Sequence, residues 1–222
     1  HKHRRRQRQM CIRDRMMVEK VSDRRFSVEG SPADCVMAAL HDCMLDARPD
    51  LVLSGVNRGN NAAENTLYSG TIGGAMEAAL QGIPAVALSQ YYGPANRDLD
   101  DPFEAAAGHG ADVIRRILDA TPAHGDGYRL LYNVNFPPVA AAEVQGIRLA
   151  PQGMRRDTSF STIPQLSPSG RRFLWIKGAD QQIPTDDGTD AALNLDGYIS
   201  VTPMRADLTA HDTFDALKAI NT

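Results

Sequence analysis

One stretch of the chain, residues 49–90, constrains the fold more than any other because two short apolar runs enclose a helical pattern. The first run, Leu51–Leu53, is too short for a helix and lies between a proline and a glycine, which is typical of a buried strand. A helical pattern covers Ile72–Leu80, and a second apolar run covers Ala85–Leu88. Strand, helix and strand at this spacing predict a βαβ unit with parallel strands and a right-handed crossover.

A polar loop follows the first predicted strand, at the end of the strand where α/β proteins place their chemistry. Asn57 and Asn61 offer neutral carbonyl oxygens, a donor type that suits Mg²⁺, Mn²⁺ or Ca²⁺. Asn60, next to Gly59, is expected to be a turn residue in the left-handed conformation. The alternative is that all three asparagines only shape turns.

Ser69, Gly70 and Thr71 lead directly into the helical pattern. Free backbone N–H groups at a helix start, together with two hydroxyls, can converge on an anion such as phosphate. The alternative is that Ser69 or Thr71 merely caps the helix. The residue types leave both interpretations open.

Three sequence motifs are similar to one known family: PDLVLSGVNRGNN, LYSGTIGGAMEAAL and GIPAVALS. Together they resemble the SurE family, the metal-dependent 5′/3′-nucleotidases also called survival protein E. Further similar segments are residues 30–36, 133–137 and 188–211, in the order that the family has them. The resemblance implies an α/β fold with a doubly wound, mostly parallel sheet and a Rossmann-like core. It also implies hydrolysis of nucleoside 5′- or 3′-monophosphates with one divalent cation, Mg²⁺ or Mn²⁺, per subunit.

The resemblance assigns roles to the loop residues. Asn57 corresponds to the asparagine that ligates the metal, and Asn61 is a candidate for the substrate-facing shell. Ser69, Gly70 and Thr71 correspond to the stretch beside the bound phosphate.

Two metal-binding motifs of the family do not occur in this sequence. One is an Asn-Asp-Asp-Gly motif at the end of the family's first strand, and the other is a later loop of the type Arg-Ser-Gly-Ala-Ser. The Asp-Asp pairs of this chain, at 100–101 and 186–187, lie in other contexts. We therefore expect a unit of about 30 residues or more to be missing from the front of the domain. The expected activity is impaired for the same reason, and the alternative is a catalytically inactive or structural chain.

The first fifteen residues differ in composition from the rest. They carry seven of the 24 Lys and Arg residues but one acid, so the remainder has 17 basic and 26 acidic residues. Such a run can be a nucleic-acid arm or a localisation signal, and it lacks the apolar region of a secretory signal. We expect residues 1–15 to be a non-native or disordered segment and predict no nucleic-acid partner.

The remaining residues, 16–222, are long enough for one α/β domain. No apolar stretch approaches the roughly 18 residues that suggest a membrane span, so no membrane contact is expected. The cysteines include Cys35 and Cys43, eight positions apart on one predicted helix, which is no metal or redox spacing. We expect a reduced, cytoplasmic protein.

Two further segments carry predictions. Ser31, Pro32 and Asp34 form a helix start, and the apolar residues that follow are expected to be a buried stripe: Cys35, Val36, Ala39, Leu40, Cys43 and Met44. Residues 146–211 alternate short apolar runs with turns, which favours a β-rich extension. In the family such arms exchange between subunits, so a homodimer or homotetramer is expected, with contacts through Tyr198, Ile199 and Val201. The adjacent Tyr91 and Tyr92 either line the substrate pocket or belong to a packed surface loop.

Overall fold

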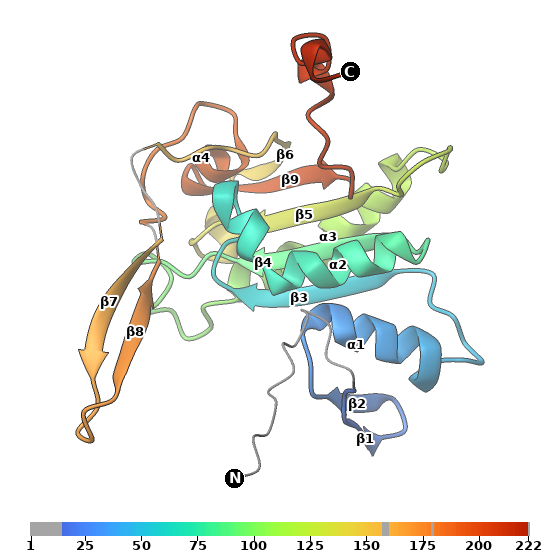
Figure 1. Cartoon of the computed structure of the whole chain (residues 1–222), viewed down its shortest axis with the longest axis horizontal. Coiled ribbons are helices and arrows are strands. Elements are labelled where there is room, and N and C mark those ends of the chain that lie inside the picture. The colour runs from blue at the N-terminus through green and yellow to red at the C-terminus, as the bar shows by residue number, and fades with distance from the viewer. Residues whose placement is uncertain (1–14, 157–159, 179, 222) are drawn as a thin grey trace.

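The computed structural model describes residues 15–156, 160–178 and 180–221, and a five-stranded sheet forms its centre (Figure 1). The strands lie in the order β3 (Val52–Arg58), β4 (Ala85–Gln90), β5 (Leu131–Phe136), β9 (Tyr198–Met204) and β6 (Gly146–Leu149). β3, β4 and β5 are parallel, β9 is antiparallel to β5, and β6 is parallel to β9. The predicted α/β fold with a mostly parallel sheet is confirmed. The predicted disorder of residues 1–15 lies outside the described residues except at Arg15.

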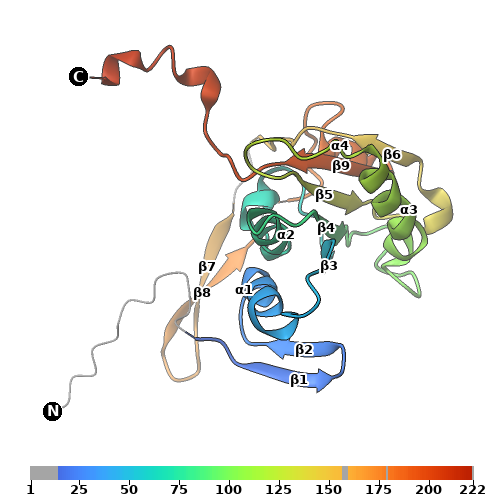
Figure 2. The same cartoon turned by 90° about the vertical axis from the view of Figure 1, so that its right-hand side faces the viewer.

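Helices cover both faces of the sheet (Figure 2). α2 (Gly70–Leu80) packs on one face, and α3 (Glu104–Ala120) packs on the other. The alternation of side chains along β4 explains this division, because neighbouring residues of a strand face opposite sides. Ala85 and Ala87 pack in the cluster that contains α2, whereas Val86 and Leu88 pack in the cluster that contains α3. A strand covered on both faces is apolar throughout its first four residues, as the sequence pattern indicates.

A bulge near the end of β3 sets the position of the loop that follows. Its register with β4 shifts between Ser54 and Asn57. Gly55 has a φ of +125°, and a Cβ placed there would lie 2.3 Å from the carbonyl oxygen of Leu88, so only glycine fits. Beyond the bulge, Asn57 pairs with Ser89 on β4. The bulge therefore brings the candidate metal ligand to the carboxyl edge of the sheet.

The predicted start of α1 (Pro32–Ala38) is confirmed, but its predicted buried stripe is wrong. Ser31 Oγ accepts a hydrogen bond from the N–H of Asp34, and the Asp34 carboxylate accepts one from the N–H of Ser31. Along the helix and the π-helical turn after it (Ala39–Cys43), Cys35 and Met44 are exposed and only Ala38 is buried. α1 packs against α2 beside β3, the last strand of the described sheet, so the described chain covers it on one side only.

Residues 146–211 divide between the sheet and a projecting hairpin. β6 and β9 belong to the central sheet, while β7 (Ser161–Leu166) and β8 (Arg172–Lys177) form an antiparallel pair that extends away from it (Figure 1). Ile199 and Val201 are buried in the core, so the expectation that they serve a subunit interface is wrong. Exposed apolar side chains lie instead on the hairpin.

Smaller elements complete the described chain. They are a hairpin of β1 (Val18–Ser22) and β2 (Arg25–Val28), the 3₁₀ turns η2 (Ala63–Tyr68), η3 (Ala141–Glu143), η4 (His211–Thr213) and η5 (Lys218–Ile220), and α4 (Asp190–Leu195). The last two turns lie on a terminal segment that leaves the sheet (Figures 1 and 2). Among the described residues, no helix has the length and apolar character needed to cross a bilayer.

Candidate functional site at the carboxyl edge of the sheet

Polar side chains gather where β3, β4 and β5 end. Asn57 on β3 lies opposite Ser89 on β4, and Ser89 lies opposite Asn135 on β5. Asn133 occupies the same face of β5 two residues earlier, and both β5 asparagines are fully buried. This edge is the place where parallel α/β sheets bind their ligands.

Asn61 is fixed to this edge by three hydrogen bonds. Its backbone N–H donates to Asn135 Oδ1 at 2.7 Å, its Nδ2 donates to Ser89 Oγ at 2.7 Å, and its carbonyl oxygen accepts from Asn133 Nδ2 at 2.9 Å. Its own side-chain oxygen has no hydrogen-bond partner in the described part of the chain. Buried amides that are bonded in this way hold a loop in one arrangement. The network thus leaves Asn61 Oδ1 as a free acceptor.

Asn57 presents the same pattern. Its side chain is half-buried, and its Nδ2 donates to the carbonyl oxygen of Gly59 at 2.9 Å. Across the described residues, Asn57 Oδ1 meets no donor. Gly59, with a φ of +115°, supplies the left-handed turn, whereas Asn60 does not have a positive φ. The prediction that Asn60 is left-handed is therefore wrong, and its side chain is buried instead.

Ser69, Gly70 and Thr71 form the start of α2, as predicted. Ser69 caps the helix, because its Oγ accepts a hydrogen bond from the N–H of Ile72 at 3.1 Å. Gly70 is exposed and Thr71 is buried. The cap satisfies one of the four N–H groups that every α-helix leaves open at its start. Capping and anion binding are compatible here, since the N–H groups of Gly70 and Thr71 have no acceptor among the described residues.

A short chain of contacts joins the two predicted groups of site residues through Thr66. The hydroxyl of Thr66 donates to the carbonyl oxygen of Asn61 at 2.9 Å, and the N–H of Ser69 donates to the carbonyl oxygen of Thr66 at 3.4 Å. Within the described residues, no hydrogen bond joins Asn57 directly to Ser69, Gly70 or Thr71. The structure brings the predicted residues to one end of one βαβ unit.

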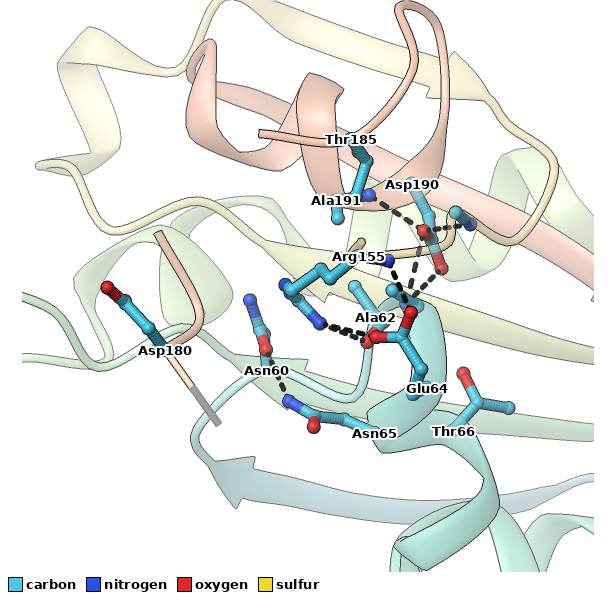
Figure 3. Close-up of polar contacts among 12 residues, drawn as sticks. Asn60, Ala62, Glu64, Asn65, Thr66, Arg155, Asp180, Thr185, Asp190 and Ala191 are labelled. Carbon is cyan, nitrogen blue, oxygen red and sulfur yellow. Dashed lines mark hydrogen bonds and ion pairs between the residues drawn. The ribbon is translucent and has the colours of Figure 1, made fainter. Parts of the chain in front are cut away.

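Residues far along the chain hold the same loop, and no local sequence pattern points to them (Figure 3). Asp190 is fully buried, and its carboxylate accepts hydrogen bonds from the N–H groups of Ala63, Gly153 and Ala191 at 3.1, 2.8 and 2.7 Å. Burial raises the pKa of Asp190, and the three N–H donors oppose that rise. Its acidic neighbours Asp186 and Asp187 are exposed, so composition alone cannot single it out.

Arg155 is the second such residue. Its side chain is 1 % exposed, its Nη1 donates to the carbonyl oxygen of Ala62 at 3.2 Å, and the same atom lies 3.4 Å from Glu64 Oε2. The backbone N–H of Arg155 also donates to Glu64. Arg155 and Asp190 therefore hold, through Ala62 and Ala63, the turn that leads from the Asn57 loop into η2.

The tyrosine loop after β4 contributes a hollow of about 470 Å³. Its lining consists of Arg58, Gly59, Tyr91, Tyr92, Gly93, Pro94, Asp180, Gln181 and Gln182. Tyr91 is buried, and burial raises its pKa, while the guanidinium of Arg58 lies 4.0 Å from the centre of the Tyr92 ring. Both tyrosine rings thus line the hollow, and protein atoms already cover most of Tyr91.

The donors at the edge differ from those of a complete divalent-cation site. Among the described residues, no group of three or more His, Cys, Asp or Glu side chains is placed to hold a metal ion. Asn57 and Asn61 supply neutral oxygens, whereas Mg²⁺ in proteins usually depends on one or two carboxylates. By themselves the described residues therefore form only part of a divalent-cation site, with Asn57 Oδ1 as its open oxygen.

A doubly wound α/β sheet with amide oxygens and a helix start at its carboxyl edge is the arrangement in which α/β proteins bind small polar ligands. A family model described as survival protein SurE matches residues 5–159. The chain belongs to the SurE family. The matched range begins inside the basic segment and ends within the part of the chain that follows β6.

Curated relatives and a solved structure agree with this membership. A 5′-nucleotidase SurE of Roseobacter denitrificans is 70% identical over 207 residues, which cover 93% of this chain and 79% of the relative. A 5′-nucleotidase SurE of Ruegeria pomeroyi is 68% identical over 204 residues, which cover 92% of this chain and 78% of the relative. The crystal structure of the SurE protein from Aquifex aeolicus has a TM-score of 0.75 and 31% identity, covering 95% of this chain and 82% of that one.

Proposed function

We propose that the chain is a 5′-nucleotidase of the SurE type, a phosphomonoesterase that acts on nucleoside monophosphates. The observation that carries this proposal is the identity of 70% to a relative with that name. We assign the ligand contacts to the loop and helix start between Asn57 and Thr71. This sequence contains both of the family-like motifs that cover these residues.

Each predicted site residue has a role in this proposal. Asn57 Oδ1 would be a ligand of a divalent cation, and Asn61 Oδ1 would face the substrate. Their amide nitrogens are committed to Gly59 and Ser89, which fixes the direction of both oxygens. Ser69, Gly70 and Thr71 hold the phosphate oxygens at the start of α2, where the helix dipole and open N–H groups favour negative charge.

The cation that the family resemblance implies, Mg²⁺ or Mn²⁺, is held weakly by such a donor set. Neutral amide oxygens contribute less attraction to a divalent ion than carboxylates do. We therefore infer that phosphomonoester hydrolysis by this chain is slow. A second candidate is a chain that binds a nucleotide without turning it over, and the lack of a carboxylate cluster in the described residues favours it.

Release of inorganic phosphate from a nucleoside 5′-monophosphate, with and without Mn²⁺, tests the proposal. We expect slow release that Mn²⁺ accelerates and that Asn57→Ala removes, while Asn221→Ala, on the terminal segment, leaves it unchanged. Nucleotide binding without any release at saturating Mn²⁺ would favour the second candidate. Fast release without added metal would contradict the assignment of Asn57.

The assembly and the compartment belong to the same proposal. We assign subunit contacts to the β7–β8 hairpin, because Trp175 and Ile176 are 61% and 76% exposed there. A homodimer or homotetramer would cover these side chains. Cys35 and Cys43 are free thiols, in keeping with a reduced, cytoplasmic protein.

A further inference from the structure

The guanidinium of Arg155 is buried while part of its hydrogen-bonding capacity is unused (Figure 3). The contacts to Ala62 and Glu64 both involve Nη1. In the described residues, neither Nε nor Nη2 meets an acceptor. A buried charged donor without an acceptor is more costly than a neutral one. The described side chains therefore supply no oxygen acceptor to this edge of the guanidinium.

The two unused nitrogens form a specific geometry. Nε and Nη2 lie on one edge of the planar group and direct two N–H bonds in parallel. This fork matches the spacing of two oxygens in a carboxylate or phosphoryl group, which is the geometry of bidentate recognition by arginine. The neutral carbonyl and the carboxylate that Arg155 contacts lie at Nη1, so they leave the fork open.

Asn60 supplies a third unused donor. Its side-chain oxygen accepts a hydrogen bond from Asn65 Nδ2 at 3.3 Å, whereas its Nδ2 is buried without a partner among the described residues. In the view of Figure 3 the Asn60 side chain lies on the side of the guanidinium that faces away from Ala62 and Glu64. Buried donors of this kind need an acceptor, and one oxyanion with several oxygens can serve both side chains.

The neighbouring acids do not fill this position. The Asp190 carboxylate accepts hydrogen bonds from backbone N–H groups and none from the Arg155 side chain. Glu64 contacts Nη1 and the backbone N–H of Arg155, and its side chain is 36% exposed. Glu64 is the one carboxylate at hydrogen-bonding distance from the guanidinium among the described residues, and it lies at Nη1. An anion at the fork would therefore contact the guanidinium on its other edge.

We propose that Arg155 Nε and Nη2, together with Asn60 Nδ2, form an oxyanion subsite that accepts a phosphoryl or carboxylate group. The subsite lies beside the Asn57–Asn61 loop and is distinct from the helix start at Ser69. It goes beyond the proposed function, because it requires neither a metal nor turnover. The three nitrogens are buried, so the oxyanion enters when neighbouring chain moves aside.

Thermal unfolding and calorimetric titration of the full chain in chelator-treated, metal-free buffer test this subsite. Four probes separate the sources of the charge: inorganic phosphate, acetate, adenosine 5′-monophosphate and adenosine. We expect at least one oxyanion to raise the unfolding temperature, while adenosine has no effect. The ranking of phosphate against acetate decides which group the fork takes.

Three variants identify the residues. Arg155→Lys keeps the charge but lacks the fork, so its oxyanion affinity should fall about tenfold to hundredfold. Arg156→Lys is the matched control, because the Arg156 side chain is 66% exposed and pairs with Asp186. Asn60→Asp should place a carboxylate at the fork, raise the unfolding temperature without ligand and abolish the response to the oxyanion.

A Ser69→Asp chain separates this inference from the proposed function. The response that remains in that chain belongs to the fork, and Arg155→Lys should remove it. If Ser69→Asp removes the whole response, the subsite is overturned while the proposed phosphate contact at α2 stands. The proposal is also overturned if Arg155→Lys and Arg156→Lys bind the oxyanion equally, or if Asn60→Asp still responds.

Discussion

The carboxylate of Asp190 accepts a hydrogen bond from the backbone N–H of Ala63, 127 residues earlier in the chain, at an N···O distance of 3.1 Å. Ala63 has a φ of +53°, a left-handed conformation that costs a non-glycine residue about 1–2 kcal/mol. Its side chain packs with Ala62 and Ala191 in a small buried cluster. The carboxylate and this packing together hold the strained turn between the candidate site and η2.

Asp190→Ala should destabilise the chain by about 2–4 kcal/mol, because it leaves buried N–H groups of Ala63, Gly153 and Ala191 without an acceptor. Urea unfolding followed by circular dichroism measures this loss. The exposed neighbour Asp187 gives a matched control, and Asp187→Ala should change the free energy of unfolding by less than about 0.5 kcal/mol. Equal effects of the two substitutions would show that Asp190 is not a structural acceptor.

Asp190→Asn should reveal the ionisation of the same group. Burial raises the pKa of Asp190 above its ordinary value of 3.8, so the native state holds the proton more tightly than the unfolded chain does. The stabilisation that comes from this proton is complete below the pKa that Asp190 has in the unfolded chain. It is lost as the pH rises through the pKa that Asp190 has in the native state. Wild type should therefore lose stability relative to Asp190→Asn as the pH rises from about 3 to 7. A stability difference that is constant over this range would contradict the raised pKa.

Local sequence patterns were sufficient for the βαβ unit and for the start of α1. The apolar runs of β3 and β4 reflect burial on the strands themselves, and the Ser31–Asp34 capping box involves residues three positions apart. The burial of α1 could not be predicted in the same way. A helical stripe shows which side chains are apolar, but the neighbours that cover them come from distant segments.

The same distinction separates the predicted from the unpredicted site residues. Asn57, Asn61 and Ser69 lie within one loop and helix start, and the family motif covers all of them. Asp190 and Arg155 reach this loop from segments that are around a hundred residues away, and a single sequence does not record such contacts. Residue preference predicts a left-handed Asn60, whereas the positive φ angles of this loop lie at Gly59 and at Ala63, where tertiary contacts hold the backbone.

Ser69→Asp should separate the two roles of the helix start. Aspartate caps helices about as well as serine, so the free energy of unfolding should stay close to that of wild type, whereas Ser69→Ala should lose about 1 kcal/mol. The added negative charge should nevertheless weaken binding of a nucleoside monophosphate by at least about tenfold. Calorimetric titration with the nucleotide measures this. If Ser69→Asp binds the nucleotide as tightly as wild type, Ser69 only caps the helix and does not contact the phosphate.

Asn57→Asp should strengthen the binding of Mn²⁺. A carboxylate adds charge at a position that now offers a neutral oxygen, and the number of charged ligands tunes the affinity for divalent cations. We expect an increase of about tenfold or more, measured by the paramagnetic effect of Mn²⁺ on water relaxation. Asn221→Asp adds the same charge on the terminal segment and should have no effect. A similar gain in both variants would indicate general charge attraction without ligation by residue 57.

Ile176→Lys should shift the chain toward monomers. Ile176 is 76% exposed on the projecting hairpin, and a charge in the middle of an apolar interface is costly to bury. Sedimentation at micromolar concentration measures the change against wild type. Ser169→Lys, in the turn between β7 and β8, is the control. A wild-type chain that sediments as a monomer would contradict the proposal that the hairpin forms subunit contacts.

The hydrogen bonds that fix Asn61 to Ser89, Asn133 and Asn135 have a consequence for experiments with ligands. They join amides and a hydroxyl, which neither gain nor lose protons over the pH range in which proteins stay folded. These hydrogen bonds therefore contribute no protonation step of their own to a pH titration. A midpoint near pH 6 in the affinity for a phosphomonoester would report either the second ionisation of the ligand, which lies at about that value, or the carboxylate of Asp190, whose pKa is raised by burial. A midpoint that persists in Asp190→Asn belongs to the ligand.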